Sequence, residues 1–220
     1  MTITHHPSDD LLFDYATGTL GEAWSLAIAT HLALCPSCRQ EIARIEAIGG
    51  SLMEATTPIA VTDDAFDRLL EHIDEGVPDL KAPSLTTPNS STPPVLPEPL
   101  RRYAGGDIEH LNWQRLGLGA SQLLLPMTET GVSARMLRIP AGRPVPTHSH
   151  GGLELTLVLS GAFSDATGHY GRGDLQEADS DLEHQPHATP ETDCVCLAIT
   201  DAPLKFKSLA ARIAQPFLGI

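Results

Sequence analysis

The sequence predicts a multidomain α + all-β protein, with a small helical domain followed by an all-β domain. Apolar residues recur at helical spacing up to about residue 75, and they alternate with polar residues at strand spacing beyond residue 130. Between these patterns, residues 76–100 contain seven prolines. Proline fixes φ and removes a backbone donor, so this stretch is expected to be an extended linker. We therefore divide the chain into residues 1–78, a linker over residues 79–97, and residues 98–220.

Four short helices are predicted before the linker. The first follows the N-cap candidate Ser8 and ends at Gly18, and the second carries apolar residues at helical spacing up to His31. Pro36 suits the first position of a third helix, which Gly49 and Gly50 are expected to end. The fourth begins near residues 62–64, and its apolar stripe is Phe66, Leu69, Leu70 and Ile73. We expect these helices to form a small bundle, and so small a core often needs a metal staple.

The region after the linker has the period of β-structure. Four leucines, at 153, 155, 157 and 159, alternate with Glu154, Thr156, Val158 and Ser160, and short apolar runs recur at 132–139 and 194–200. Glycine and proline turns separate these runs, which is typical of a β-barrel or a β-sandwich.

The formal net charge of −14 is unevenly distributed. Residues 1–78 hold three basic and thirteen acidic residues, a net of −10, which argues against direct nucleic-acid binding and favours a basic partner. No apolar run approaches the roughly 18 residues that a membrane-spanning helix needs, so we expect no membrane partner. The N-terminus also lacks the basic start and apolar stretch of a secretory signal, so we expect a cytoplasmic protein.

The stretch THLALCPSCRQE, residues 30–41, predicts a first metal site. His31 and Cys35 share a helix face, and Cys38 falls in the first turn of the next helix. Two thiolates and an imidazole suit tetrahedral zinc. A fourth ligand should come from the histidine pair upstream, and the residues alone leave His5 and His6 open. A redox pair or buried structural cysteines are the alternatives to a structural zinc.

The stretch GRPVPTHSHGGLELTLVLSG, residues 142–161, predicts a second metal site. His148 and His150 are two residues apart and face the same way on a strand, and Glu154 lies beyond a Gly-Gly turn. Imidazole and carboxylate ligands accept zinc as well as iron, manganese or nickel. On the strand at 194–200, Cys194 and Cys196 share a face and are either oxidisable sensors or small buried residues.

Residues 142–161 resemble the first motif of the cupin superfamily, G-x5-H-x-H-x3-E-x6-G, without a departure. The resemblance implies a small β-barrel with a metal inside it. The second cupin motif, G-x5-P-x-G-x2-H-x3-N, is only partly present: Gly173 fits, Asp179 and Asp181 replace Pro and Gly, and Ala188 replaces Asn. By this resemblance His184 is the fourth ligand, with His187 as its rival.

The H-x3-C-x2-C stretch and the earlier HHPSDDLLFDYATGTL resemble the zinc-binding anti-sigma domain, and more narrowly the ChrR-type anti-sigma factors, over essentially the whole chain. In that family the second histidine of the pair completes the zinc site, which implies His6. The family's helical domain binds an extracytoplasmic-function sigma factor, inserts between its two DNA-binding domains and blocks RNA polymerase.

We therefore expect a non-enzymatic anti-sigma factor with zinc at His6, His31, Cys35 and Cys38. A second metal ion, zinc or another divalent metal, is expected at His148, His150, Glu154 and His184. The resemblance suggests that the cupin domain senses oxidative stress such as singlet oxygen. The alternatives are a metal-dependent cupin dioxygenase with a helical appendage, and a protein that stores or senses metal.

Overall fold

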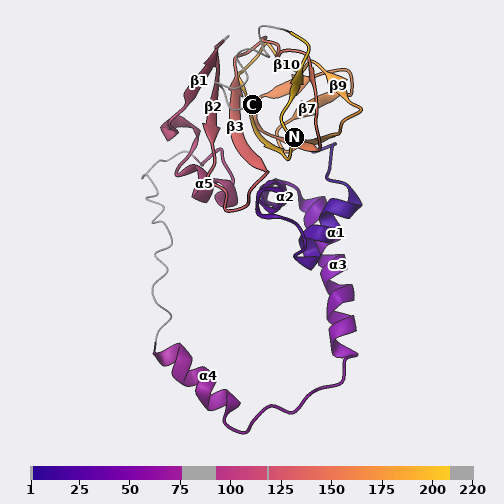
Figure 1. The fold of residues 1–220 in the computed structure, drawn as a ribbon, viewed down its shortest axis with the longest axis vertical. Coiled ribbons are helices and arrows are strands. Elements are labelled where there is room, and N and C mark those ends of the chain that lie inside the picture. Colours follow the sequence, from indigo (N-terminus) through magenta and orange to yellow (C-terminus); the bar gives the residue numbers. More distant parts are fainter. Residues whose placement is uncertain (1, 76–92, 118, 209–220) are drawn as a thin grey trace.

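The computed structural model describes residues 2–75, 93–117 and 119–208. Its helices are α1 (Asp9–Thr17), α2 (Glu22–Leu34), α3 (Pro36–Glu54), α4 (Ala65–Asp74), α5 (Glu98–Ala104) and the short 3-10 helix η1 (Ile108–His110). Helices α1 to α3 pack together, α5 lies against α2, and α4 stands apart from the other helices (Figure 1). Within these described residues, no helix is long and apolar enough to cross a membrane.

The β domain consists of twelve short antiparallel strands within the described residues. They are β1 (Gln114–Gly117), β2 (Ala120–Leu124), β3 (Ser133–Ile139), β4 (His148–Ser149), β5 (Glu154–Ser160), β6 (Ala162–Ser164), β7 (His169–Gly171), β8 (Leu175–Ala178), β9 (Glu183–His184), β10 (His187–Ala188), β11 (Cys194–Thr200) and β12 (Lys205–Phe206). Six form one sheet in the order β1-β2-β3-β11-β5-β8, and two three-stranded sheets, β10-β6-β7 and β12-β4-β9, complete the domain. The large sheet does not close on itself, so the structure is cupin-like without showing the closed barrel that we expected.

The central strands β5 and β11 are buried on both faces. Their interior-facing side chains include Thr156 and Cys196, which line a cavity. Their other face, with Leu157 and Leu197, joins the apolar side chains of α2 in one hydrophobic cluster. The helical region and the β domain therefore share a continuous core, which explains why α2 is apolar around its circumference.

The helix boundaries differ clearly from expectation in one place, the end of α3. Gly18 ends α1 in the left-handed conformation at φ 72°, and Pro36 begins α3, as predicted. Gly49 and Gly50 do not end α3, which continues to Glu54. An exposed glycine costs a helix only about 1 kcal/mol, so two of them need not stop it.

The predicted four-helix bundle is not observed, because α4 buries none of its residues. Its apolar stripe, which includes Phe66 and Leu69, faces solvent. The small bundle instead completes its core against the β domain. Most of the predicted linker lies outside the described residues, and at its C-terminal end Leu96 is fully buried against the β domain.

Candidate metal centres

Four residues from three consecutive segments meet at the N-terminal candidate centre. His31 lies in the last turn of α2, Cys35 lies between α2 and α3, and Cys38 lies in the first turn of α3. His6 comes from the extended segment that precedes α1. One donor atom from each of these side chains lies within 4.8 Å of the others. His6 rather than His5 belongs to the group. The His5 ring instead packs at a tilt against Tyr170, with a centroid distance of 4.2 Å.

Three donor–donor distances in this group match those of a tetrahedral zinc site. His6 Nδ1 lies 3.4 Å from Cys35 Sγ and 3.3 Å from Cys38 Sγ. His31 Nε2 lies 3.3 Å from Cys38 Sγ. Ligands at the usual Zn–N and Zn–S distances of about 2.0 and 2.3 Å are roughly 3.3–3.8 Å apart. These three distances therefore fit a tetrahedral zinc ion.

The protonation states of this group also favour a cation. The carbonyl of Gly173 lies 2.8 Å from His31 Nδ1 and can only accept, so Nδ1 carries the hydrogen and Nε2 offers its lone pair to the group. Burial lowers the pKa of His31 to about 4, so the ring is neutral at neutral pH.

The two thiols of the group influence each other. Burial and the neighbouring Cys35 raise the pKa of Cys38 to about 12. The pKa of Cys35 is lowered, because hydrogen bonds from Ser37 and Cys38 outweigh its burial. Two adjacent thiolates repel each other unless a cation lies between them, and a bound metal would keep both ionised.

The second candidate centre lies inside the β domain, where four elements converge. His148 in β4 pairs directly with His184 in β9, His150 follows β4, and Glu154 begins β5. All four side chains are buried, and one donor atom from each lies within 4.8 Å of the others. His187, the rival of His184, is exposed and lies outside this group.

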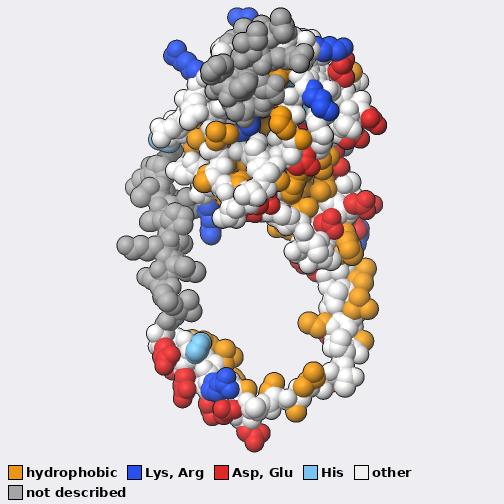
Figure 2. All heavy atoms as spheres, viewed as in Figure 1, with side chains coloured by type: hydrophobic (Ala, Val, Ile, Leu, Met, Phe, Trp, Pro, Cys, Tyr) orange, Lys and Arg blue, Asp and Glu red, His pale blue; other side chains and the backbone are white. Residues whose placement is uncertain are grey.

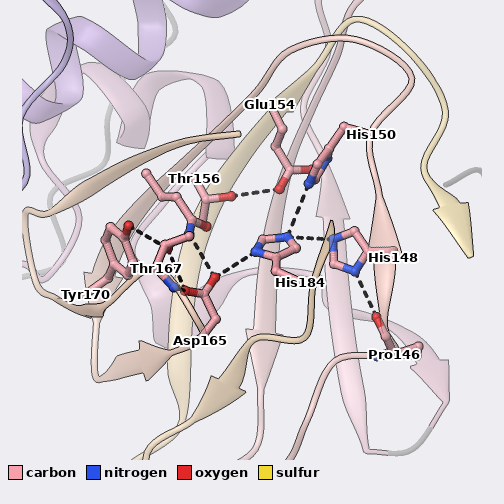
Figure 3. A network of polar contacts seen from close by, with 10 residues as sticks. Pro146, His148, His150, Glu154, Thr156, Asp165, Thr167, Tyr170 and His184 are labelled. Carbon is pink, nitrogen blue, oxygen red and sulfur yellow. Dashed lines mark hydrogen bonds and ion pairs between the residues drawn. The ribbon is translucent and has the colours of Figure 1, made fainter. Parts of the chain in front are cut away.

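Three imidazole nitrogens of this centre face one another. His184 Nε2 lies 3.1 Å from His148 Nε2 and 3.2 Å from His150 Nε2 (Figure 3). The Nδ1 atoms of His148 and His184 are bound to the acceptors Pro146 O and Asp165 Oδ2, at 2.8 and 2.7 Å. Each Nδ1 therefore carries the hydrogen, so the facing Nε2 lone pairs repel unless a cation binds between them.

Burial has opposite effects on the acids and bases of this centre. It lowers the pKa of both His148 and His150 to about 4, which leaves them as neutral donors. It raises the pKa of Glu154 to about 7, although Thr156 Oγ1 donates a hydrogen bond to the carboxylate. A bound cation would restore the ionised form of Glu154. Both groups of residues are thus able to hold a metal ion.

Sequence reasoning missed Asp165. Its carboxylate is fully buried and accepts hydrogen bonds from His184, Thr167 and Gln176 (Figure 3). These bonds outweigh burial and lower the pKa of Asp165 to about 2. In the sequence, Asp165 stands in SDATG, which has the composition of an ordinary hairpin turn. No sequence signal distinguishes this residue, because its partner His184 is remote in the chain.

Cys194 and Cys196 are buried in β11 on the face that we expected them to share. Together with His148, Glu154 and His184 they line a small cavity whose other walls are mostly apolar. Contact with Cys194 and burial raise the pKa of Cys196 well above its ordinary value. Both thiols lie beside the candidate metal centre.

Comparisons with protein families, characterised proteins and solved structures each give a match. A family model described as the ChrR cupin-like domain matches residues 102–202. The anti-sigma-E factor ChrR of Cereibacter sphaeroides is 46% identical over 220 residues, which span 100% of both chains. The crystal structure of Rhodobacter sphaeroides SigE in complex with the anti-sigma ChrR matches with a TM-score of 0.76 and 46% identity, covering 91% of this chain and 100% of that chain.

Proposed function

This chain belongs to the ChrR family of anti-sigma factors, and from that premise we propose that it binds and inhibits an extracytoplasmic-function sigma factor. Its role is regulatory rather than catalytic. The net charge of −10 over residues 1–78 suits a partner whose DNA-binding faces are basic. We place this activity in the cytoplasm and assign no direct contact with nucleic acid or a membrane.

The observation that carries the proposal is an unusually exposed apolar surface on the N-terminal region. Nine large apolar side chains between the end of α3 and the end of α4 are between 44% and 91% exposed: Ile48, Leu52, Met53, Ile59, Val61, Phe66, Leu69, Leu70 and Ile73. Figure 2 shows hydrophobic side chains along this exposed part of the chain. Extended apolar patches of this kind mark protein–protein interfaces. We call these nine residues the α3–α4 surface and propose that the sigma factor covers it.

Replacing Leu69 and Ile73 together by Ala should weaken sigma-factor binding by about tenfold to a hundredfold, because buried apolar anchors carry most of the energy of an interface. Both side chains are exposed in the free protein, so the metal content and thermal stability should not change. Titration calorimetry with the purified sigma factor measures the effect. His72→Ala, on the polar side of the same helix, is the matched control. Unchanged binding by a folded double variant would place the interface elsewhere.

We infer that the N-terminal group holds structural zinc through His6, His31, Cys35 and Cys38. The tetrahedral spacing and the two thiols support zinc over harder metals. When bound, the ion supplies folding free energy to a bundle with a small core of its own. The domain division at residues 1–78, 79–97 and 98–220 remains part of this proposal.

We further propose that the cupin domain receives the signal and that His148, His150, Glu154 and His184 hold zinc or another divalent metal there. The cavity beside these residues, with two buried thiols in its wall, supports a sensing role. Oxidative or singlet-oxygen-type stress is the signal that we assign. Oxidation of the thiols or rearrangement of the metal ligands would change the packing of β5 and β11 beneath α2.

A further inference from the structure

Helix α2 is held on the β domain at its N-terminus. The carboxylate of Glu129, in the loop after β2, accepts hydrogen bonds from the main-chain N–H groups of Glu22 and Ala23, at 3.2 and 2.9 Å. The Glu22 carboxylate in return accepts from the N–H of Thr128 at 2.7 Å and from Tyr103 Oη at 3.0 Å. This reciprocal capping satisfies donors that a helix N-terminus otherwise leaves unpaired.

The opposite end of α2 is held by the turn between β7 and β8. The Gly173 carbonyl accepts the hydrogen bond of His31 Nδ1 at 2.8 Å and so fixes the ring orientation of a candidate zinc ligand. Gly173 has φ +93°, and a Cβ atom there would lie 2.5 Å from Ile3 Cδ1. Glycine is therefore required for the turn to approach the N-terminal segment and α2 this closely.

The same turn also fixes the segment that carries His6. The Asp174 carboxylate oxygen Oδ1 accepts from the N–H groups of Thr4 and His5, at 2.7 and 2.9 Å, and the N–H of Leu175 donates to the His5 carbonyl at 3.1 Å. His6 follows directly. The turn of the β domain thus positions two of the four candidate ligands of the N-terminal group.

The residues before this turn contact the candidate metal ligands of the cupin domain. Asp165 Oδ2 holds His184 Nδ1 at 2.7 Å, and Asp165 Oδ1 accepts from the N–H and hydroxyl of Thr167. Thr167 Oγ1 lies 2.9 Å from Tyr170 Oη, and the Tyr170 ring packs at a tilt against His5. Figure 3 shows this chain of contacts running from His148 through His184 and Asp165 to Tyr170.

We propose that the ten-residue segment Asp165–Asp174 positions candidate ligands at both centres and thereby couples the cupin metal to the N-terminal zinc. A displacement of His184 at one end moves Asp165. The continuous contacts carry that movement to the turn that orients His31 and His6. Coupling of this kind is reciprocal, so each metal must change the protein's affinity for the other by the same factor. The proposal rests on the proposed metal ions at both centres, and metal analysis of the variants described below measures their occupancy.

Cobalt retention in the full chain tests the positioning role of Asp174. Co²⁺ bound to two thiolates gives charge-transfer absorption that is specific to the N-terminal group, and EDTA then removes the ion at a measurable rate. Asp174→Ala should accelerate this loss by about tenfold or more, as removal of outer contacts to metal ligands does. Asp174→Asn, which keeps one acceptor oxygen for Thr4 and His5, should give an intermediate rate. Asp181→Asn, at an exposed carboxylate in another turn, should leave the rate unchanged.

Total metal analysis on the same samples separates the outcomes. Absence of thiolate bands in the unmodified chain would refute zinc ligation itself, whereas bands with equal loss rates in all folded variants would overturn only the positioning role. If Asp174→Ala does not fold, the rate of cobalt loss from Asp174→Asn tests the positioning role instead.

The coupling is tested by emptying the cupin centre. His148→Ala should change the rate of cobalt loss from the N-terminal group by about fivefold or more, which is the lower end of ordinary allosteric coupling. Thr167→Val removes the hydroxyl contacts in the middle of the segment and changes no candidate ligand. In the Thr167→Val background, His148→Ala should therefore change the rate of cobalt loss by a smaller factor. An unchanged rate in His148→Ala, or an equal effect of His148→Ala with and without Thr167→Val, would overturn the proposal.

Discussion

Replacing Cys35 and Cys38 together by Ser should remove one metal equivalent per chain and abolish sigma-factor binding. Structural zinc contributes apparent binding free energies of about 10–16 kcal/mol in zinc-finger peptides, far more than the stability of a three-helix unit of this size. Without the ion, no metal bond links α2 to α3, and the segment before α1 is no longer held to them through His6. Metal analysis, circular dichroism and calorimetric titration with the sigma factor measure the three consequences.

The other cysteine pair of the chain provides the control. Replacing Cys194 and Cys196 together by Ala removes two buried thiols from β11 and leaves the N-terminal group intact. That variant should keep the N-terminal zinc and the sigma-factor affinity. If the Cys35 and Cys38 variant retains two metal equivalents, the N-terminal zinc assignment is wrong.

Substituting His148 or Glu154 by Ala should empty the cupin centre and abolish induction of sigma-dependent transcription. The α3–α4 surface and the N-terminal candidate ligands are unchanged in these variants, so basal transcription should stay low. The changed exchange rate of the N-terminal zinc that we propose above does not empty that site when zinc is available. Release of the sigma factor needs only a small change in binding free energy, because a tenfold loss of affinity corresponds to about 1.4 kcal/mol. A reporter from a sigma-dependent promoter, with and without photosensitiser and light, measures both levels.

His187→Ala serves as the matched control for the cupin variants. His187 is exposed and lies outside the candidate group, so this variant should keep the cupin metal and normal induction. High basal transcription from folded His148→Ala protein would show that the cupin domain helps to hold the sigma factor. Normal induction from it would show that the cupin metal plays no part in the signal.

The N-terminal metal group could be predicted from sequence because its spacing is local. His31 and Cys35 are one helical turn apart, and Pro36 sets the helix break that brings Cys38 back towards them. The choice of His6 came from family resemblance, since adjacent histidines in an extended segment have no periodicity that separates them. At the cupin centre, the motif identified three residues and the degraded second motif still identified His184, whose partner across β4 and β9 is His148.

The contact between the two parts of the chain could not be predicted. The proline-rich stretch suggested that the helical region is joined to the cupin only by a linker, but α2 packs directly on β5 and β11. The hydrogen bonds of Gly173 to His31 and of Asp174 to Thr4 join residues that are 142 and 170 positions apart, and no sequence periodicity indicates them. For helix α4 the sequence predicted a contact that is not observed. Its amphipathic stripe predicted burial, and the described structure leaves it exposed.

Purification of the chain from its native cells under unstressed conditions tests the central claim most directly. We expect a stoichiometric complex with an extracytoplasmic-function sigma factor, with bound zinc, that blocks transcription when added to RNA polymerase and a sigma-dependent promoter. Metal-loaded protein that carries no sigma factor, binds none when mixed with the purified sigma factors of the same cell, and consumes O2 with an organic substrate would contradict the account.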